Sequence, residues 1–166
     1  MGEPKILVLY YSRSGNTRKM AELIHQSARA EGGVEADLLP VEEAAARQLL
    51  DYDAIVAGSP TYYGTMAWPL KKLLDESVAF HGRLDGRVGA AFSSSGGLAG
   101  GNETTVLDIL KAFLIHGMIV QGDPEGDHYG AVAVGAPDPR AAESCRKLGR
   151  RVARLVKRLH SGPSAG

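Results

Sequence analysis

The first apolar segment of the chain comprises residues 6–11, and a polar cluster rich in hydroxyl side chains follows it. The cluster consists of Ser12, Arg13, Ser14, Gly15, Asn16 and Thr17. A helical pattern begins directly after it, so the cluster joins a buried strand to the N-terminus of a helix. Free backbone N–H groups, nearby hydroxyls and the positive end of a helix dipole together bind phosphate groups. The cluster therefore predicts a phosphate-binding loop, although serine and threonine also cap helices that bind no ligand.

Two adjacent tyrosines follow the third apolar segment, Ala54–Ala57, which we expect to end at Gly58-Ser59-Pro60. The candidate ligand-binding residues of this second loop are Pro60, Thr61, Tyr62, Tyr63 and Gly64. Tyrosine ring faces and free backbone amides are what a flat heteroaromatic cofactor needs for stacking and for hydrogen bonds at its edge. Tyr63 is a candidate catalytic residue because it would shape the pocket. A surface turn with two half-buried tyrosines is the alternative.

A serine- and glycine-rich segment follows the fourth apolar segment, Val88–Phe92. Its candidate ligand-binding residues are Ser93, Ser94, Ser95, Gly96 and Gly97. The glycines would let the backbone approach a flat ligand closely, and the serines would supply hydrogen-bond donors. A flexible linker has a similar composition. Because the carboxyl ends of parallel strands meet at one edge of a sheet, we expect all three loops to lie together there.

Strand-like and helix-like segments alternate along the chain, which is typical of a parallel sheet with helices on both faces. Further strands are expected at 34–39 and at 118–120 together with 131–134, the last two forming one interrupted or extended strand. Helices are expected at 18–30, 68–74, 105–115 and 139–159. The sequence therefore predicts one α/β domain over residues 1–160, followed by a polar tail at 161–166 that we expect to be disordered.

The segment from Ile6 to Thr17 resembles the FMN-phosphate motif of the flavodoxin-like superfamily, and the likeness continues to Val134. Within that superfamily the chain most resembles the tryptophan-repressor-binding-protein family of FMN-dependent NAD(P)H:quinone oxidoreductases. The matching runs are 58–64, 100–105 and 115–118. The resemblance implies a flavodoxin-like three-layer sandwich, with a five-stranded parallel sheet in the order 2-1-3-4-5. It also implies non-covalent FMN at the three loops and a homo-oligomer, either a dimer or a tetramer.

The same resemblance places His116 near the flavin, as a second candidate catalytic and cofactor-binding residue. Judged from the residues alone, His116 is more often a histidine that satisfies carbonyl groups at the end of a helix. Two family features are missing: a longer segment between the second and third strands, and a tryptophan before the fourth, where Phe80 and His81 lie nearest. Both absences concern oligomer formation and quinone selectivity more than flavin binding.

The function that the resemblance implies is two-electron reduction of quinones by NAD(P)H through bound FMN. The alternative is a flavodoxin in the strict sense, which carries electrons between protein partners. Such carriers tend to be strongly acidic around the flavin, which helps them dock to basic partners. This chain has 19 basic and 19 acidic residues, a formal net charge of zero, so the reductase is favoured. Asp123, Glu125 and Asp127 could still form a local acidic rim.

Composition and motifs argue against several other classes. Hydrophobic residues make up 44% and charged residues 23%, as in ordinary globular domains, and zero net charge gives no reason to expect nucleic acid as a partner. Neither a Walker A loop nor the dinucleotide pattern G-x-G-x-x-G occurs, and no histidine has metal-ligand spacing. With one cysteine, no apolar run of membrane-spanning length and no signal-peptide core at the start, we expect a cytoplasmic protein.

Overall fold

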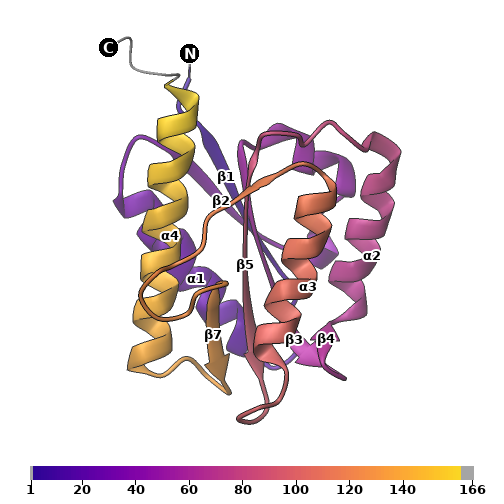
Figure 1. Cartoon of the computed structure of the whole chain (residues 1–166), viewed down its shortest axis with the longest axis vertical. Coiled ribbons are helices and arrows are strands. Elements are labelled where there is room, and N and C mark those ends of the chain that lie inside the picture. Colours follow the sequence, from indigo (N-terminus) through magenta and orange to yellow (C-terminus); the bar gives the residue numbers. More distant parts are fainter. Residues whose placement is uncertain (1, 162–166) are drawn as a thin grey trace.

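The computed structural model describes residues 2–161 and shows a parallel sheet between two layers of helices (Figure 1). Its strands are β1 (Lys5–Tyr10), β2 (Glu35–Pro40), β3 (Ala54–Tyr62), β4 (Thr65–Met66), β5 (Val88–Ser95), β6 (Ile119–Val120) and β7 (Ala131–Val134). The helices are α1 (Asn16–Ala30), α2 (Trp68–Glu76), α3 (Asn102–Ile115) and α4 (Pro139–His160), with 3₁₀ turns η1 (Val41–Glu43), η2 (Ala46–Asp51) and η3 (Ser77–Phe80). Residues 162–166 of the expected disordered tail lie outside the described residues.

The sheet has the predicted strand order. Its strands run β2-β1-β3-β5-β6, which is 2-1-3-4-5 when the parallel strands are counted along the chain. The fifth strand is interrupted, as expected: β6 pairs with the start of β5, and β7 pairs with the end of β5. The residues between β6 and β7 loop out toward α4 (Figure 1). Short β4 folds back on the end of β3 as an antiparallel hairpin.

Side chains alternate between the two faces of the sheet because successive residues of a strand point in opposite directions. In β1, Ile6 and Val8 pack in the cluster under α1 and α4, whereas Leu7 and Leu9 pack in the cluster under α2 and α3. Figure 1 shows these two helix pairs on opposite sides of the sheet. Helix α1, which follows β1, covers one face, and α2, which follows β3 and β4, covers the other, so the chain leaves the neighbouring strands β1 and β3 toward opposite faces.

Two strands are longer than the sequence analysis predicted. Strand β3 continues through Gly58, Ser59 and Pro60, which were expected to stop it. Pro60 is tolerated because β1 ends opposite Gly58, so no ladder bond to β1 is required at residue 60. Strand β5 likewise continues through Ser93–Ser95, which were expected to form a loop. No helix in the described part of the chain combines the length and apolar character needed to cross a bilayer.

Candidate functional site

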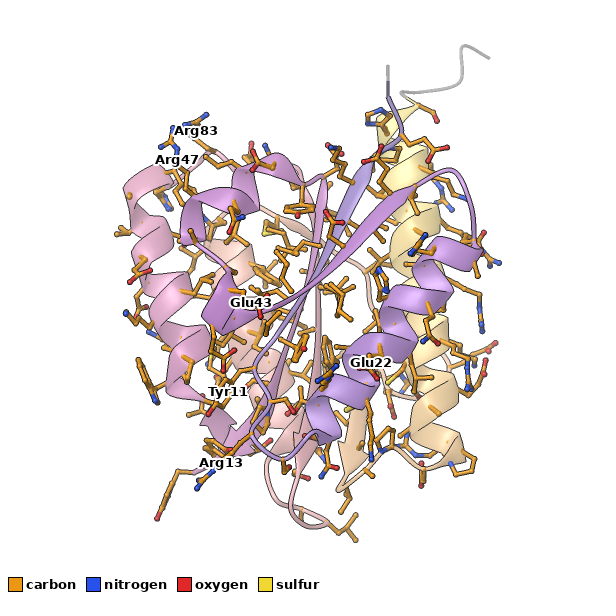
Figure 2. All side chains as sticks on the ribbon, turned by 180° about the vertical axis from the view of Figure 1, so that it is seen from behind. Tyr11, Arg13, Glu22, Glu43, Arg47 and Arg83 are labelled. Atoms are coloured by element: carbon orange, nitrogen blue, oxygen red, sulfur yellow. The ribbon has the colours of Figure 1, made fainter. Side chains whose placement is uncertain are left out.

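Three loops meet at the carboxyl edge of the sheet, at the lower end of Figure 1. They are the turn between β1 and α1, the β3–β4 hairpin turn, and the loop between β5 and α3. Figure 2 shows Tyr11 and Arg13 at this same end of the molecule, with Arg47 and Arg83 at the opposite end. All the predicted cofactor-binding residues except His116 lie in or beside these loops.

The turn after β1 is built to present backbone N–H groups. Gly15 caps α1 in the left-handed conformation, with φ of 94°. The Ser12 hydroxyl accepts hydrogen bonds from the N–H groups of Gly15 and Arg18, at 3.1 and 3.2 Å. The first-turn amides of Asn16 and Thr17 have no acceptor within a helix. They are therefore free to bind an anion, and the helix dipole favours negative charge at that point.

The serines predicted to contact the cofactor are buried at the end of β5, where their hydroxyls bond within the protein. Ser93 donates to the Ser59 carbonyl at 2.8 Å, and Ser94 shares a 2.8 Å hydrogen bond with Thr17 of the first loop. Ser95 donates to the Gly97 carbonyl at 2.9 Å. These bonds hold the first and third loops in position. Of the predicted third-loop set, Gly96 and Gly97 lie in the loop itself.

The hairpin turn between β3 and β4 carries an exposed aromatic surface. Tyr63 is fully exposed, and Tyr62 packs edge-on against Tyr11 with 6.5 Å between the ring centroids. Tyr63 has φ of 48°, and Ala99 in the third loop has φ of 54°. Among the described residues these two are the non-glycine residues with positive φ. Backbone strain of this kind clusters at ligand-binding sites, so its presence in two of the three loops points to a ligand here.

Three residues that the sequence analysis missed help to position these loops. The Thr105 hydroxyl donates to the Gly101 carbonyl at 2.8 Å and shares a 3.0 Å hydrogen bond with the Thr61 hydroxyl. The Asn102 amide donates to the Ser95 hydroxyl at 2.9 Å. Tyr11 supplies the neighbour for Tyr62. Tyr11 could have been found from its place directly before the phosphate loop. The roles of Thr105 and Asn102 depend on how α3 packs on β3 and β5, which no local pattern reveals.

The structure does not bring His116 together with the three loops. Helix α3 starts at the loop edge and has 14 residues, so its far end lies about 20 Å away at 1.5 Å per residue. His116 caps that far end, and the next residue, Gly117, accepts a hydrogen bond from the Gly86 N–H at 3.0 Å. Residue 86 belongs to the turn before β5, at the opposite edge of the sheet. Within one chain, His116 therefore does not line the loop site.

The acidic cluster is largely paired with cations of α4. Asp123 pairs with Arg151 at 2.6 Å, and Asp127 pairs with Arg140 at 2.8 Å. The hydrogen bond from Arg151 lowers the pKa of Asp123. Two of the three acidic side chains are therefore neutralised by α4.

Cys145 is buried in the same helix, and burial raises the pKa of its thiol to about 12, so the thiolate form is strongly disfavoured.

Comparison with known proteins identifies the family. The sequence profile of the flavodoxin domain matches residues 7–114. The chain belongs to the flavodoxin family. A flavodoxin of Aquifex aeolicus is 42% identical over 160 residues, covering 92% of this chain and 86% of that protein. An NAD(P)H dehydrogenase (quinone) of Archaeoglobus fulgidus is 34% identical over 189 residues, covering 93% and 98%.

A solved structure gives the same answer for the fold. The flavodoxin, WrbA-like protein from Agrobacterium tumefaciens aligns with a TM-score of 0.78 and 26% identity, covering 93% of this chain and 98% of that chain. The expected flavodoxin-like sandwich is thus confirmed. The superfamily resemblance is confirmed as well, although a strongly similar relative bears the name flavodoxin and not that of a reductase.

Family membership implies FMN as the cofactor, and the residues at the carboxyl edge fit it. In flavodoxins, which are a standard example of ligand binding at a switch in strand order, FMN lies at the β1/β3 switch point. Here that point holds the free amides of Asn16 and Thr17 beside the exposed tyrosines of the hairpin. An ideal Cβ at Gly15 or Gly96 would meet no atom within 4 Å, so both backbones are open to a ligand.

Proposed function

We propose that the chain binds FMN at the three loops and works as an electron carrier between redox partners. The observation that carries this proposal is that Tyr63 is fully exposed and strained, beside the turn after β1 whose backbone N–H groups are free. His116 lies at the far end of α3, about 20 Å from the loop edge. One edge of one chain thus offers a cofactor site whose ring side faces outward. A carrier needs little more, because its partners must approach the cofactor edge and no substrate has to be enclosed.

Each loop has a separate task in this proposal. The amides of Asn16 and Thr17 bind the phosphate, with Ser12 holding the turn in shape. Tyr62 and Tyr63 stack on the flat ring, and the backbone around Gly64 and Gly96 contacts its polar edge. FMN, when bound, supplies the electron-transfer chemistry, and the protein contributes orientation and electrostatics. No covalent role is assigned to any side chain.

The second candidate function is that of an NAD(P)H:quinone oxidoreductase. Its support is the 34% identical relative named NAD(P)H dehydrogenase (quinone), which matches over nearly its whole length. In this case NAD(P)H is the electron donor, a quinone is the acceptor, and a homo-oligomer is expected. His116 could then act only if it comes from another copy of the chain. A cytoplasmic location suits both candidates, since a single cysteine forms no internal disulfide.

Two measurements test these functions: FMN binding, which both candidates require, and NAD(P)H oxidation, which separates them. FMN binding is measured by quenching of flavin fluorescence, with Tyr63→Ala expected to weaken it and Tyr129→Ala, an exposed tyrosine outside the three loops, as the matched control. The FMN-saturated protein is then mixed with NADH or NADPH and benzoquinone. A carrier should show no quinone-dependent NAD(P)H oxidation, yet should pass electrons to cytochrome c after photoreduction. Rapid NAD(P)H oxidation would instead establish the reductase.

A further inference from the structure

A groove of about 590 Å³ runs between α2 and α3, from β4 at the loop edge to the far end of α3. This volume lies within the range of small-molecule sites, roughly 300–1,000 Å³. Its lining is largely apolar, and two of its side chains, Val78 and Ile115, are 74% and 72% exposed. A concave apolar strip that remains open to water is typical of a site that a ligand covers.

The charged side chains along the groove neutralise one another. Lys71 pairs with Asp75 at 2.6 Å, and Lys111 pairs with Asp108 at 2.5 Å. Thr65 also donates a hydrogen bond to Asp108 at 2.6 Å. With each cation matched by a carboxylate, these pairs give the groove no net charge. It therefore favours a neutral ligand over a phosphate or an ammonium group.

His116 lines the far end of this groove and is only 7% exposed. In the described part of the chain its Nδ1 is the single buried side-chain nitrogen or oxygen without a hydrogen-bond partner. Buried polar atoms are almost always paired, because an unpaired one costs about 1–3 kcal/mol. An orphaned atom beside an apolar groove marks the point where a polar group of a ligand would bind.

The protons around His116 show which kind of polar group is missing. The Ser77 hydroxyl donates its one proton to the Leu74 carbonyl, at 2.6 Å. Its contact with His116 Nε2, at 2.7 Å, must therefore be a bond that Nε2–H donates to the serine oxygen. Burial, with a smaller contribution from His81, lowers the pKa of His116 and favours the neutral ring. Nδ1 consequently carries a lone pair and needs a donor.

We propose that the groove binds a small neutral aromatic molecule that donates an O–H hydrogen bond to Nδ1 of His116, with phenols as the simplest class. An aromatic ring at the groove favours an aromatic body: the His81 ring lies 5.7 Å from the imidazole. The buried Phe80 ring does not line the groove and stacks on the imidazole itself, at 6.3 Å and an 18° tilt. His81 is exposed and also lines the groove, so it can rotate to admit the ligand. The His116 end of the groove lies at the edge of the sheet opposite the three loops.

The test compares phenol with toluene, which has the same shape but a methyl group in place of the hydroxyl. Both are titrated into the full-length chain, with FMN in excess to occupy the loops, and binding is followed by NMR shifts. Phenol should bind about ten-fold more tightly, with shifts confined to α2 and α3 and a change in the Nδ1 nitrogen resonance. His116→Phe should remove this preference, whereas His160→Phe, at the end of α4, should keep it.

Ser77→Ala provides a second test that does not remove the imidazole. Without the serine oxygen, Nε2 loses its acceptor and the ring proton can move to Nδ1, so the preference for phenol over toluene should fall several-fold. Equal binding of the two probes to the unmodified chain would overturn the proposal, as would unchanged phenol binding in His116→Phe. A dimer in light scattering that blocks phenol binding would overturn it too, by showing that a second copy covers the groove.

Discussion

Substituting Gly149 with alanine tests how closely α1 and α4 pack. Gly149 lies in the interior of α4, where replacing glycine by alanine ordinarily stabilises a helix by about 1 kcal/mol. In this fold a Cβ at that position would lie 2.1 Å from the Ser27 hydroxyl oxygen and 2.3 Å from the Ile24 carbonyl oxygen. The carbonyl belongs to the backbone of α1, so no rotamer change relieves that contact. Helix α4 would have to move by about 1 Å to restore an ordinary separation.

The expected result is destabilisation, opposite in sign to the helix-propensity effect. Overpacking costs up to about 3 kcal/mol, and subtracting the propensity gain of about 1 kcal/mol leaves a net loss of about 2 kcal/mol. For a domain of this length, that loss lowers Tm by about 4–8 °C. Urea unfolding followed by circular dichroism gives the free energy of unfolding directly. A Gly149→Ala protein as stable as the parent, or more stable, would refute the close contact between the helices.

Ser27→Ala supplies the matched control for this prediction. It removes the hydroxyl oxygen from the clash but leaves the Ile24 carbonyl in place. The double variant should therefore recover part of the loss caused by Gly149→Ala, without reaching the stability of Ser27→Ala alone. A double-mutant cycle measures this coupling. Two fully additive effects would mean that the new methyl group does not meet Ser27.

Tyr63→Gly should raise the free energy of unfolding by up to about 1 kcal/mol, because the left-handed strain relieved in the folded state exceeds the cost of the extra backbone entropy in the unfolded state. FMN binding should weaken in the same variant. Urea unfolding of the cofactor-free chain and flavin fluorescence check the two parts, and a loss of stability would contradict the strain argument. Burial, together with the hydrogen bond that Tyr52 donates to Asp37, raises the pKa of Tyr52 to about 12. Since the folded state keeps this proton longer than the unfolded state, stability from this group is complete below pH 10 and is lost as pH rises toward 12. Tyr52→Phe should therefore show a shallower fall in unfolding free energy across that interval, and identical slopes would exclude the contribution.

The sequence patterns by themselves predicted the fold class, and the family resemblance supplied the strand order. The alternation of short apolar runs with helical periodicity predicts a parallel sheet because each element must bury one face against the next. The three polar loops, each of which comes after a strand, are then expected at one edge of the sheet, since parallel strands end on the same side. The interrupted fifth strand was also predictable, because its two halves, at 119–120 and 131–134, are both apolar. That these loops bind FMN remains a prediction.

Only the tertiary structure decided which polar side chains bond within the protein and which stay open at the loop edge. Serine composition could not distinguish hydroxyls open to a cofactor from those of Ser93 and Ser94, whose partners lie on β3 and α1, distant in sequence. Likewise the sequence could place His116 at a helix end, but not at the edge opposite the loops and facing Ser77. Such hydrogen bonds join residues dozens of positions apart, and their geometry depends on how helices pack across the sheet. Local patterns therefore determine the elements, and packing determines the chemistry that their ends present.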